Sequence, residues 1–225
     1  MTVIRKISKI IVIGVLIGIL MLLLQNKLGW SDSLLMYYYK WTATIIILGA
    51  IAFNIVWQIL FIKKVLGTAK LLEDGKVDDY IGENEAILDK TTNPMRQAMI
   101  KLNIAVGYGE KNNYRKALSI MEEININLVR GINRGVYINN LAYFLFKNNR
   151  DNEGLAILSK YDSELVKWQN TNLGPHIYFT NILAQVAQGD NDKAKEMLAN
   201  VLETVKDKRI LEDANELANE LGVIK

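Results

Sequence analysis

The sequence TATIIILGAIAFNIVWQILFI at residues 42–62 decides how this chain is organised. It contains no charged side chain, and a helix of this length rises about 30 Å, enough to cross the hydrocarbon layer of a membrane. A second apolar stretch, IIVIGVLIGILMLLL at residues 10–24, precedes it. Lys9 and Lys27 flank that stretch with side chains long enough to reach the membrane surface. The two stretches together predict a pair of transmembrane helices.

Positive charge lies unequally around the two stretches. Three basic residues, Arg5, Lys6 and Lys9, directly precede the first stretch, and Lys63 and Lys64 directly follow the second, whereas only Lys27 and Lys40, offset by Asp32, lie between the stretches. Because Lys and Arg are enriched on the cytoplasmic side, we expect a two-span membrane protein with both termini in the cytoplasm. The alternative is that residues 10–24 belong to a cleaved signal peptide, although no Ala-x-Ala motif follows them.

Composition separates the two parts of the chain further. The 225 residues carry a net charge of +3, but residues 1–64 hold seven Lys or Arg against one Asp, so the remainder is slightly acidic. Nothing resembles a basic face with interleaved aromatic residues, so we expect no nucleic-acid binding. The absence of cysteine excludes disulfides, thiolate metal sites and cysteine nucleophiles. We divide the chain into a membrane anchor at residues 1–64 and a cytoplasmic domain at residues 65–225. The sequence is also rich in Ile, Lys and Asn, a composition that we associate with bacteria.

A short pattern recurs three times in the second part, where an Asn or Gly that can end a helix is followed five positions later by a small residue. The pairs are Asn112 and Ala117, Asn149 and Gly154, and Gly189 and Ala194. Asn and Gly tolerate the left-handed conformation that ends a helix, and a small residue lets the next helix pack closely on the first. We predict N-caps at Asn113, at Asp151 or Asn152, and at Asn191 or Asp192. The expected fold is all-α, with two transmembrane helices followed by an array of helical hairpins.

This pattern resembles the tetratricopeptide repeat, in which a small and an aromatic residue on one helix, a turn, and an alanine on the next helix recur about every 34 residues. The first unit carries the resemblance best, at Ala105, Tyr108, Asn112, Tyr114, Ala117 and Met121. In the second unit Leu145 replaces the aromatic residue and Gly154 the alanine. In the third unit Ile182 replaces the small residue and Gln185 the aromatic residue. Successive small positions lie 37 and 40 residues apart, and no unit ends in the family's proline.

Two segments flank the predicted array. Gly75 followed by Tyr80 has the spacing of a degenerate unit, but Tyr80 is too large for the close-packed position, so we interpret this segment as a cap. Residues 211–221, closed by Gly222, are expected to form a terminal helix that shields the last apolar face.

The resemblance implies a domain that binds a protein or peptide in a concave groove. The side chains that correspond to the groove row of the family are Tyr143, Phe146, Phe179 and Leu183, with Asn140 as a nearby polar contact. Leu102 and Val106 stand where chaperone-binding members carry Lys and Asn, so the carboxylate clamp of those members is not implied. The alternative is that Tyr143, Phe146 and Phe179 are core residues, which the apolar character of these helices on more than one side favours.

Small and polar residues inside the predicted spans indicate helix association. Gly14 and Gly18 form a Gly-x-x-x-Gly motif, for which chance is the alternative because glycine is frequent in membrane helices. Asn54 and Gln58 lie on one helical face, where we expect them to hydrogen-bond between helices or between copies of the chain rather than to line a transport path.

No constellation predicts an enzyme, a cofactor or a metal site. His176, the only histidine, follows Pro175 at a helix start, where a surface or capping role is expected. Gly107 and Gly109 lack the third glycine and the strand of a dinucleotide site. The sequence therefore predicts a membrane-anchored scaffold that binds a protein or peptide. The alternative is an accessory or assembly subunit of a larger membrane complex, such as a transporter, that makes its contacts through the spans.

Overall fold

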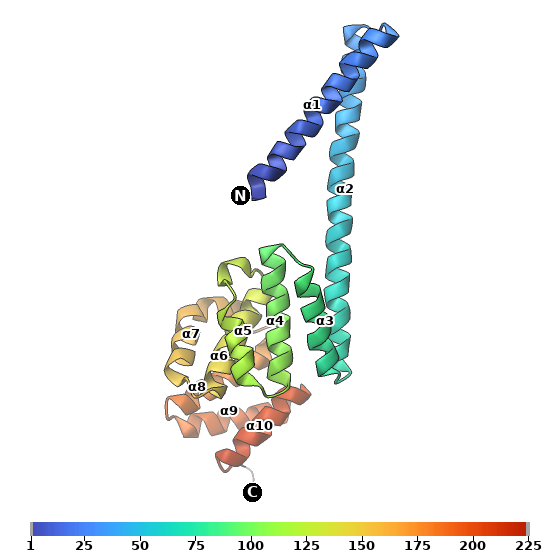
Figure 1. The fold of residues 1–225 in the computed structure, drawn as a ribbon. Coiled ribbons are helices and arrows are strands. Elements are labelled where there is room, and N and C mark those ends of the chain that lie inside the picture. Colours follow the sequence, from blue (N-terminus) through green and yellow to red (C-terminus); the bar gives the residue numbers. More distant parts are fainter. Residues whose placement is uncertain (1, 224–225) are drawn as a thin grey trace. The chain divides into compact units, whose positions relative to one another are not determined.

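The computed structural model describes residues 2–223, with side chains at residues 12 and 14–223, and divides into two compact units, Met1–Lys64 and Val65–Lys225. All regular structure within residues 2–223 is helical, which confirms the all-α prediction there (Figure 1). The α-helices are α1 (Thr2–Leu28), α2 (Asp32–Glu73), α3 (Val77–Asp89), α4 (Pro94–Glu110), α5 (Tyr114–Glu122), α6 (Ile132–Lys147), α7 (Asp151–Leu165), α8 (Gly174–Ala187), α9 (Asn191–Thr204) and α10 (Lys208–Glu220). Short 3-10 helices lie at Ile126–Leu128 and Val166–Trp168.

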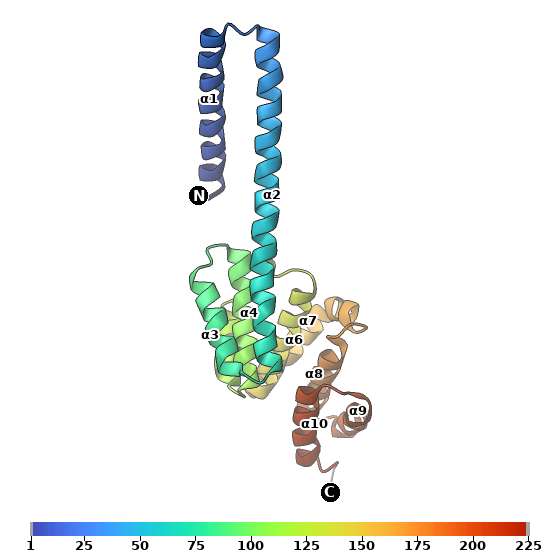
Figure 2. The same cartoon turned by 90° about the vertical axis from the view of Figure 1, so that its right-hand side faces the viewer.

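The first unit consists of α1 and the part of α2 up to Lys64, which run in opposite directions (Figure 2). Gly29, with a φ of +65°, turns the chain between them, and the Gln25 amide donates a 2.7 Å hydrogen bond to Asp32. Among the residues whose side chains the structure describes, one helix, α2, is long and apolar enough to span a membrane, and the described apolar part of α1, Gly14–Leu28, is shorter. The side chains of Ile10, Ile11 and Ile13, at the start of the predicted first span, lie outside this description. The structure thus gives one candidate span where the sequence predicted two.

Three helical hairpins form the body of the second unit. They pair α4 with α5, α6 with α7, and α8 with α9, while α3 packs on α4 and α10 packs on α9. Each predicted turn has the left-handed backbone that ends its first helix, with φ of +56° at Asn112, +57° at Asn149 and +80° at Gly189. These three turn predictions are confirmed.

The small residues lie at the helix contacts for which they were predicted. Ala117 and Ala194 are fully buried, and a Cβ on Gly154 would lie 2.7 Å from the ring of Phe146. The facing positions on the first helices, Ala105, Ala142 and Ile182, are also fully buried. A larger side chain at the second-helix positions would push the two helices of a hairpin apart.

The predicted N-caps are correct for one hairpin and wrong for two. The Asn113 side chain accepts a 3.2 Å hydrogen bond from the amide of Lys116 at the start of α5. Asp190, rather than Asn191 or Asp192, caps α9 by accepting from the Lys193 amide. At α7 the N-cap is Arg150, with no capping side chain, and Asp151 is already helical. The helix begins two residues after each left-handed residue, so the cap lies immediately after that residue.

Tyr80 of α3 occupies a close-packed position despite its size because the facing residue on α4 is a glycine. A Cβ on Gly107 would lie 3.0 Å from the Tyr80 ring and 2.6 Å from the Ile81 side chain. A Cβ on Gly109 would lie 2.8 Å from the ring of Phe144. The two glycines of α4 are therefore packing positions for neighbouring side chains.

A buried polar chain fastens α3 to its neighbours within the second unit. Asn84, which is fully buried, donates to the Thr68 hydroxyl at the end of α2 and accepts from the Asn103 amide of α4. These bonds satisfy polar groups that would otherwise destabilise the interior.

The last helix, α10, begins three residues earlier than predicted, because Asp207 caps it by accepting from the Ile210 amide. Its apolar side packs on α8 and α9 through Ile210, Ala214, Leu217 and Ala218, which are buried. The predicted terminal helix therefore covers the last hairpin.

Candidate functional site

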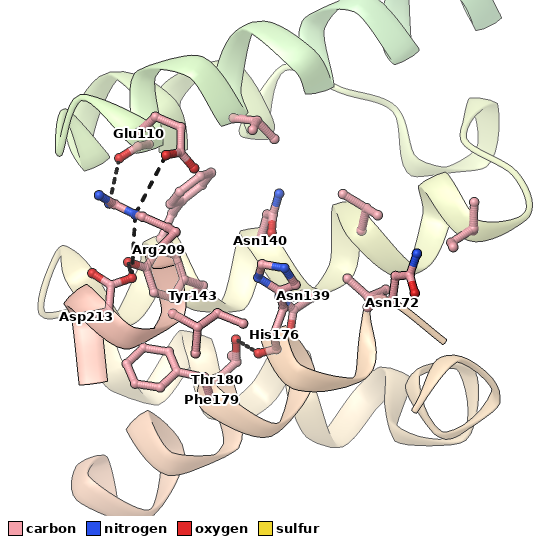
Figure 3. Close-up of a pocket in the computed structure, with 17 residues that line it drawn as sticks. Glu110, Asn139, Asn140, Tyr143, Asn172, His176, Phe179, Thr180, Arg209 and Asp213 are labelled. Carbon is pink, nitrogen blue, oxygen red and sulfur yellow. Dashed lines mark hydrogen bonds and ion pairs between the residues drawn. The ribbon is translucent and has the colours of Figure 1, made fainter. Parts of the chain in front are cut away.

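A cavity of about 330 Å³ lies where side chains of α4, α6, α8 and α10 meet, and is named the inner cavity below (Figure 3). Its apolar walls include Val106 and Val136, while Asn139, Asn140, His176 and other polar side chains face the same space. A concave site with apolar walls and a few polar groups is the usual form of a binding pocket.

The predicted groove row divides between this cavity and the core. Asn140, Tyr143 and Phe179 line the cavity, whereas Phe146 and Leu183 do not. Phe146 is only 7% exposed and packs with Ala142 and Ala184, and Leu183 is half-buried against the same cluster. Phe179, at 3% exposed, also belongs to the core formed by α8, α9 and α10. Phe146 is thus a core residue, and the site is narrower than an open groove.

Asn139 has an unsatisfied polar atom in the wall of the inner cavity. The residue is 2% exposed, and its Oδ1 is the one buried side-chain oxygen or nitrogen among the described residues that has no hydrogen-bond partner. An unpaired buried acceptor costs about 1 to 3 kcal/mol of stability. The Oδ1 atom itself is not accessible to solvent, so it lies behind the surface of the cavity.

Arg209 of α10 closes one end of the inner cavity by contacting the first hairpin. Its Nη2 donates to the carbonyl oxygen of Gly109, to the Asn112 side chain at 2.7 Å and to the Tyr114 hydroxyl. Its Nε lies 3.7 Å from Asp213 and 4.0 Å from Glu110 (Figure 3). The last helix therefore occupies part of the face that the first helices of the hairpins would otherwise leave open.

The carboxylate of Asp213 is the centre of the second half of this cluster. It accepts a 2.8 Å hydrogen bond from the Tyr143 hydroxyl, and Lys147 lies 3.9 Å away. The predicted groove residue Tyr143 is thereby held by a helix of its own chain.

Burial changes the proton affinity of three groups here. Desolvation raises the pKa of Glu110, and the nearby Arg209 only partly opposes it. Desolvation also lowers the pKa of His176, against the effect of Asp207, so this imidazole is mainly neutral at neutral pH. Burial opposes the charge of Arg209, but the anionic surroundings led by Asp213 outweigh it and raise the pKa.

The groups around His176 do not form a catalytic arrangement that we recognise. Its Nε2 lies 3.9 Å from Asp207, and its carbonyl oxygen accepts a hydrogen bond from Thr180. No serine is among the residues that line the inner cavity, and the described side chains contain no group of three or more His, Asp or Glu suited to a metal ion. The lining offers both donors and acceptors to a bound group, through the amides of Asn140 and Asn172 and the imidazole of His176.

In the first unit, the predicted packing residues do not bring α1 and α2 together. A Cβ on Gly14 or on Gly18 would have no other atom within 4 Å. Gln58 donates a 3.0 Å hydrogen bond to Asn54, so the two amides pair along α2 instead of between helices. Gly14 and Asn54 instead line a cavity of about 730 Å³ between the two helices.

Sequence reasoning missed Glu110, Arg209 and Asp213 because nothing local connects them. Arg209 lies 100 residues after Gly109, the backbone group that it contacts. The spacing of Arg209 and Asp213, four residues apart on one helix, is a common surface ion pair and carries no indication of a site.

No protein-family model, no curated protein and no solved structure matches this chain.

Proposed function

We propose that this protein is a membrane-attached recognition module whose helical domain, residues 65–225, binds a protein or peptide segment at the cytoplasmic face of the membrane. The observation that carries the proposal is the inner cavity itself, whose apolar walls also carry the polar side chains of Asn140, Asn172 and His176. A concave site of this kind binds a partner side chain on its apolar walls and orients it with a few polar groups.

The arrangement of the hairpins supports the same proposal. Three hairpins with left-handed turns and small contact residues agree with the pattern that resembles the tetratricopeptide repeat. The inner cavity is lined by α4, α6 and α8, the first helices of those hairpins. In the tetratricopeptide repeat, the first helix of each hairpin contributes to the groove that binds a partner. The inner cavity is therefore the place where we expect a partner segment to bind.

A photo-crosslinking residue at Asn140 tests this proposal in native membranes. Asn140 is half-buried in the cavity wall, and Ala199, exposed on α9, is the matched control position. We expect a crosslinked partner from position 140 and none from position 199. Equal labelling from both positions, or none from position 140, would contradict the proposed site.

Attachment to the membrane with both termini in the cytoplasm is part of the proposal. The chain has no cysteine, so single cysteines at Ser33, in the first turn of α2, and at Ser119, exposed on α5, report on topology directly. We expect an impermeant thiol reagent to label position 33 on intact cells and to leave position 119 unlabelled. Labelling at 119 but not at 33 would place the helical domain outside.

A second candidate function is that of an accessory or assembly subunit of a larger membrane complex. The observation that favours it is the apolar cavity between α1 and α2, where Gly14, Ala43 and Ala50 leave room beside Asn54. Small residues allow another membrane helix to approach closely. A photo-crosslinking residue at Ala50 distinguishes the candidates, because a subunit of this kind would give its main product there and a scaffold would give it at position 140.

A further inference from the structure

We propose that the inner cavity accepts the side chain of a lysine or arginine of the partner segment, so that the site selects a basic sequence. The inference rests on the proposed function, because it names the chemistry of the segment that the cavity binds.

Several polar groups of the lining already have partners within the chain. The Tyr143 hydroxyl donates to Asp213, and the Thr180 hydroxyl donates to the carbonyl oxygen of His176. The Nη2 of Arg209 is shared among three acceptors. The carboxylate of Glu110 accepts none of these hydrogen bonds, so it is the acceptor of the lining that a donating ligand can meet.

The charges around the cavity select a cation among such donors. Two carboxylates, Glu110 and Asp213, line it with a single guanidinium, that of Arg209. Asp213 also has Tyr143 and Lys147 as partners, whereas Arg209, at 4.0 Å, is the one cation paired with Glu110 among the described side chains. The Glu110 side chain is 31% exposed, so a ligand can reach it.

The raised pKa of Glu110 agrees with this account of the charges. Burial disfavours its ionised form more than Arg209 favours it, so the carboxylate lacks compensating charge in the free chain. A ligand ammonium or guanidinium beside Glu110 would supply that charge. An acidic ligand group would instead add to the excess of carboxylates.

The shape of the lining suits a long side chain that carries its charge at the tip. Val106 and Glu110 lie one helical turn apart on α4 and both line the cavity, with Val136 of α6 and Ile210 of α10 as further apolar walls. Lysine and arginine have aliphatic stems that pack on apolar surface while the charged end meets a polar group.

The test uses the full-length chain in nanodiscs of uncharged phosphatidylcholine, with empty nanodiscs as the blank for lipid binding. Blocked alanine peptides that carry one central lysine, norleucine or glutamate are titrated by calorimetry. We expect the lysine peptide to bind about tenfold more tightly than the norleucine peptide, the fold-change of one charged hydrogen bond. The glutamate peptide is expected to bind most weakly, and the lysine affinity is expected to fall as salt is added.

Glu110→Gln is the decisive variant, because glutamine keeps the shape of the side chain and removes its charge. We expect it to weaken lysine-peptide binding about tenfold and to leave norleucine-peptide binding unchanged. Glu203→Gln, which removes an exposed carboxylate of α9, is the charge control and should bind as the parent does. Equal binding of the lysine and norleucine peptides, or parental binding by Glu110→Gln, would overturn the inference.

The proposed function and this inference fail in different ways. If all the peptides bind alike, or if none binds while the crosslinker at position 140 captures a partner, the basic specificity is wrong and the recognition function stands. If no peptide binds and position 140 captures nothing, both are wrong.

Discussion

Tyr143 of α6 donates a 2.8 Å hydrogen bond to Asp213 of α10, joining residues 70 positions apart across the inner cavity. This contact holds the first turns of the last helix against the middle hairpin, while Arg209 on the same helix holds the first hairpin. The array is thus closed upon itself at one end of the cavity, and the remaining space is a pocket of limited size.

Tyr143→Phe tests this closure. The variant keeps the ring and removes the hydroxyl, so Asp213 loses a charged hydrogen bond and retains Arg209 and Lys147. We expect the free energy of unfolding to fall by about 1 to 2 kcal/mol, measured by denaturant titration of the full chain in detergent. Tyr178→Phe, at an exposed position on α8, is the control and should match the parent. An unchanged Tyr143→Phe would mean that α10 is not held by this bond.

The aromatic row gives a prediction about the core. Phe146 lies against Gly154, and Phe179 packs among the residues of α9 and α10, so alanine at either position leaves a cavity in the interior. Each substitution should lower the free energy of unfolding by about 3 to 5 kcal/mol, seen as a large drop in the melting temperature. If both variants melt at nearly the parental temperature, Phe146 and Phe179 are surface residues, as an open groove requires, and not core residues.

The pH dependence of stability is predicted from Glu110. Because burial raises its pKa above the ordinary 4.5, the native chain keeps the proton at pH values where the unfolded chain has lost it, and stability falls as the pH rises through that window. Glu110→Gln removes the penalty, so we expect it to melt above the parent near pH 7 and to lose this advantage toward about pH 4. If the melting temperature of Glu110→Gln exceeds that of the parent by more as the pH falls, the raised pKa of Glu110 is contradicted.

The turns provide a prediction that depends only on the backbone. Asn149 has a φ of +57°, a conformation that Asn tolerates and that other side chains disfavour by about 1 to 2 kcal/mol. We therefore expect Asn149→Ala to destabilise the chain by about 1 kcal/mol and Asn149→Gly to be neutral or slightly stabilising. Thermal melts of the pair decide the point, since equal effects of Ala and Gly would mean that the asparagine side chain is what matters.

Local features of the fold were predictable from sequence, and the site was not. The turns at Asn112 and Asn149 and the small residue at Gly154 follow from backbone conformation and close packing, which short patterns report. The cap of α9 is Asp190, one residue before the predicted Asn191, and the N-cap position of α7 is Arg150, which makes no capping hydrogen bond. The sequence could not identify these positions because several polar residues follow each turn and only the backbone geometry selects among them.

The inner cavity depends on where α10 returns, which no short pattern records. Arg209 meets the carbonyl of Gly109 only because the packing of the hairpins brings α10 back to the end of α4. Predicting Asn140 and Tyr143 as site residues was possible from the repeat pattern, but recognising that Tyr143 is held by Asp213 required the structure.

The central claim is that the inner cavity is the recognition site. Its most direct test measures two properties of Asn139→Leu: the melting temperature, and the capture of a partner by a photo-crosslinking residue placed at position 140 of the same variant. Leucine removes the unpaired Oδ1 and has the adjoining cavity to accommodate its methyl groups. We predict that the variant melts at a higher temperature than the parent, by an amount equivalent to about 1 to 3 kcal/mol, and that it no longer captures the partner. A variant that melts lower, or that captures the partner as well as the parent does, would contradict the assignment of the inner cavity as the recognition site.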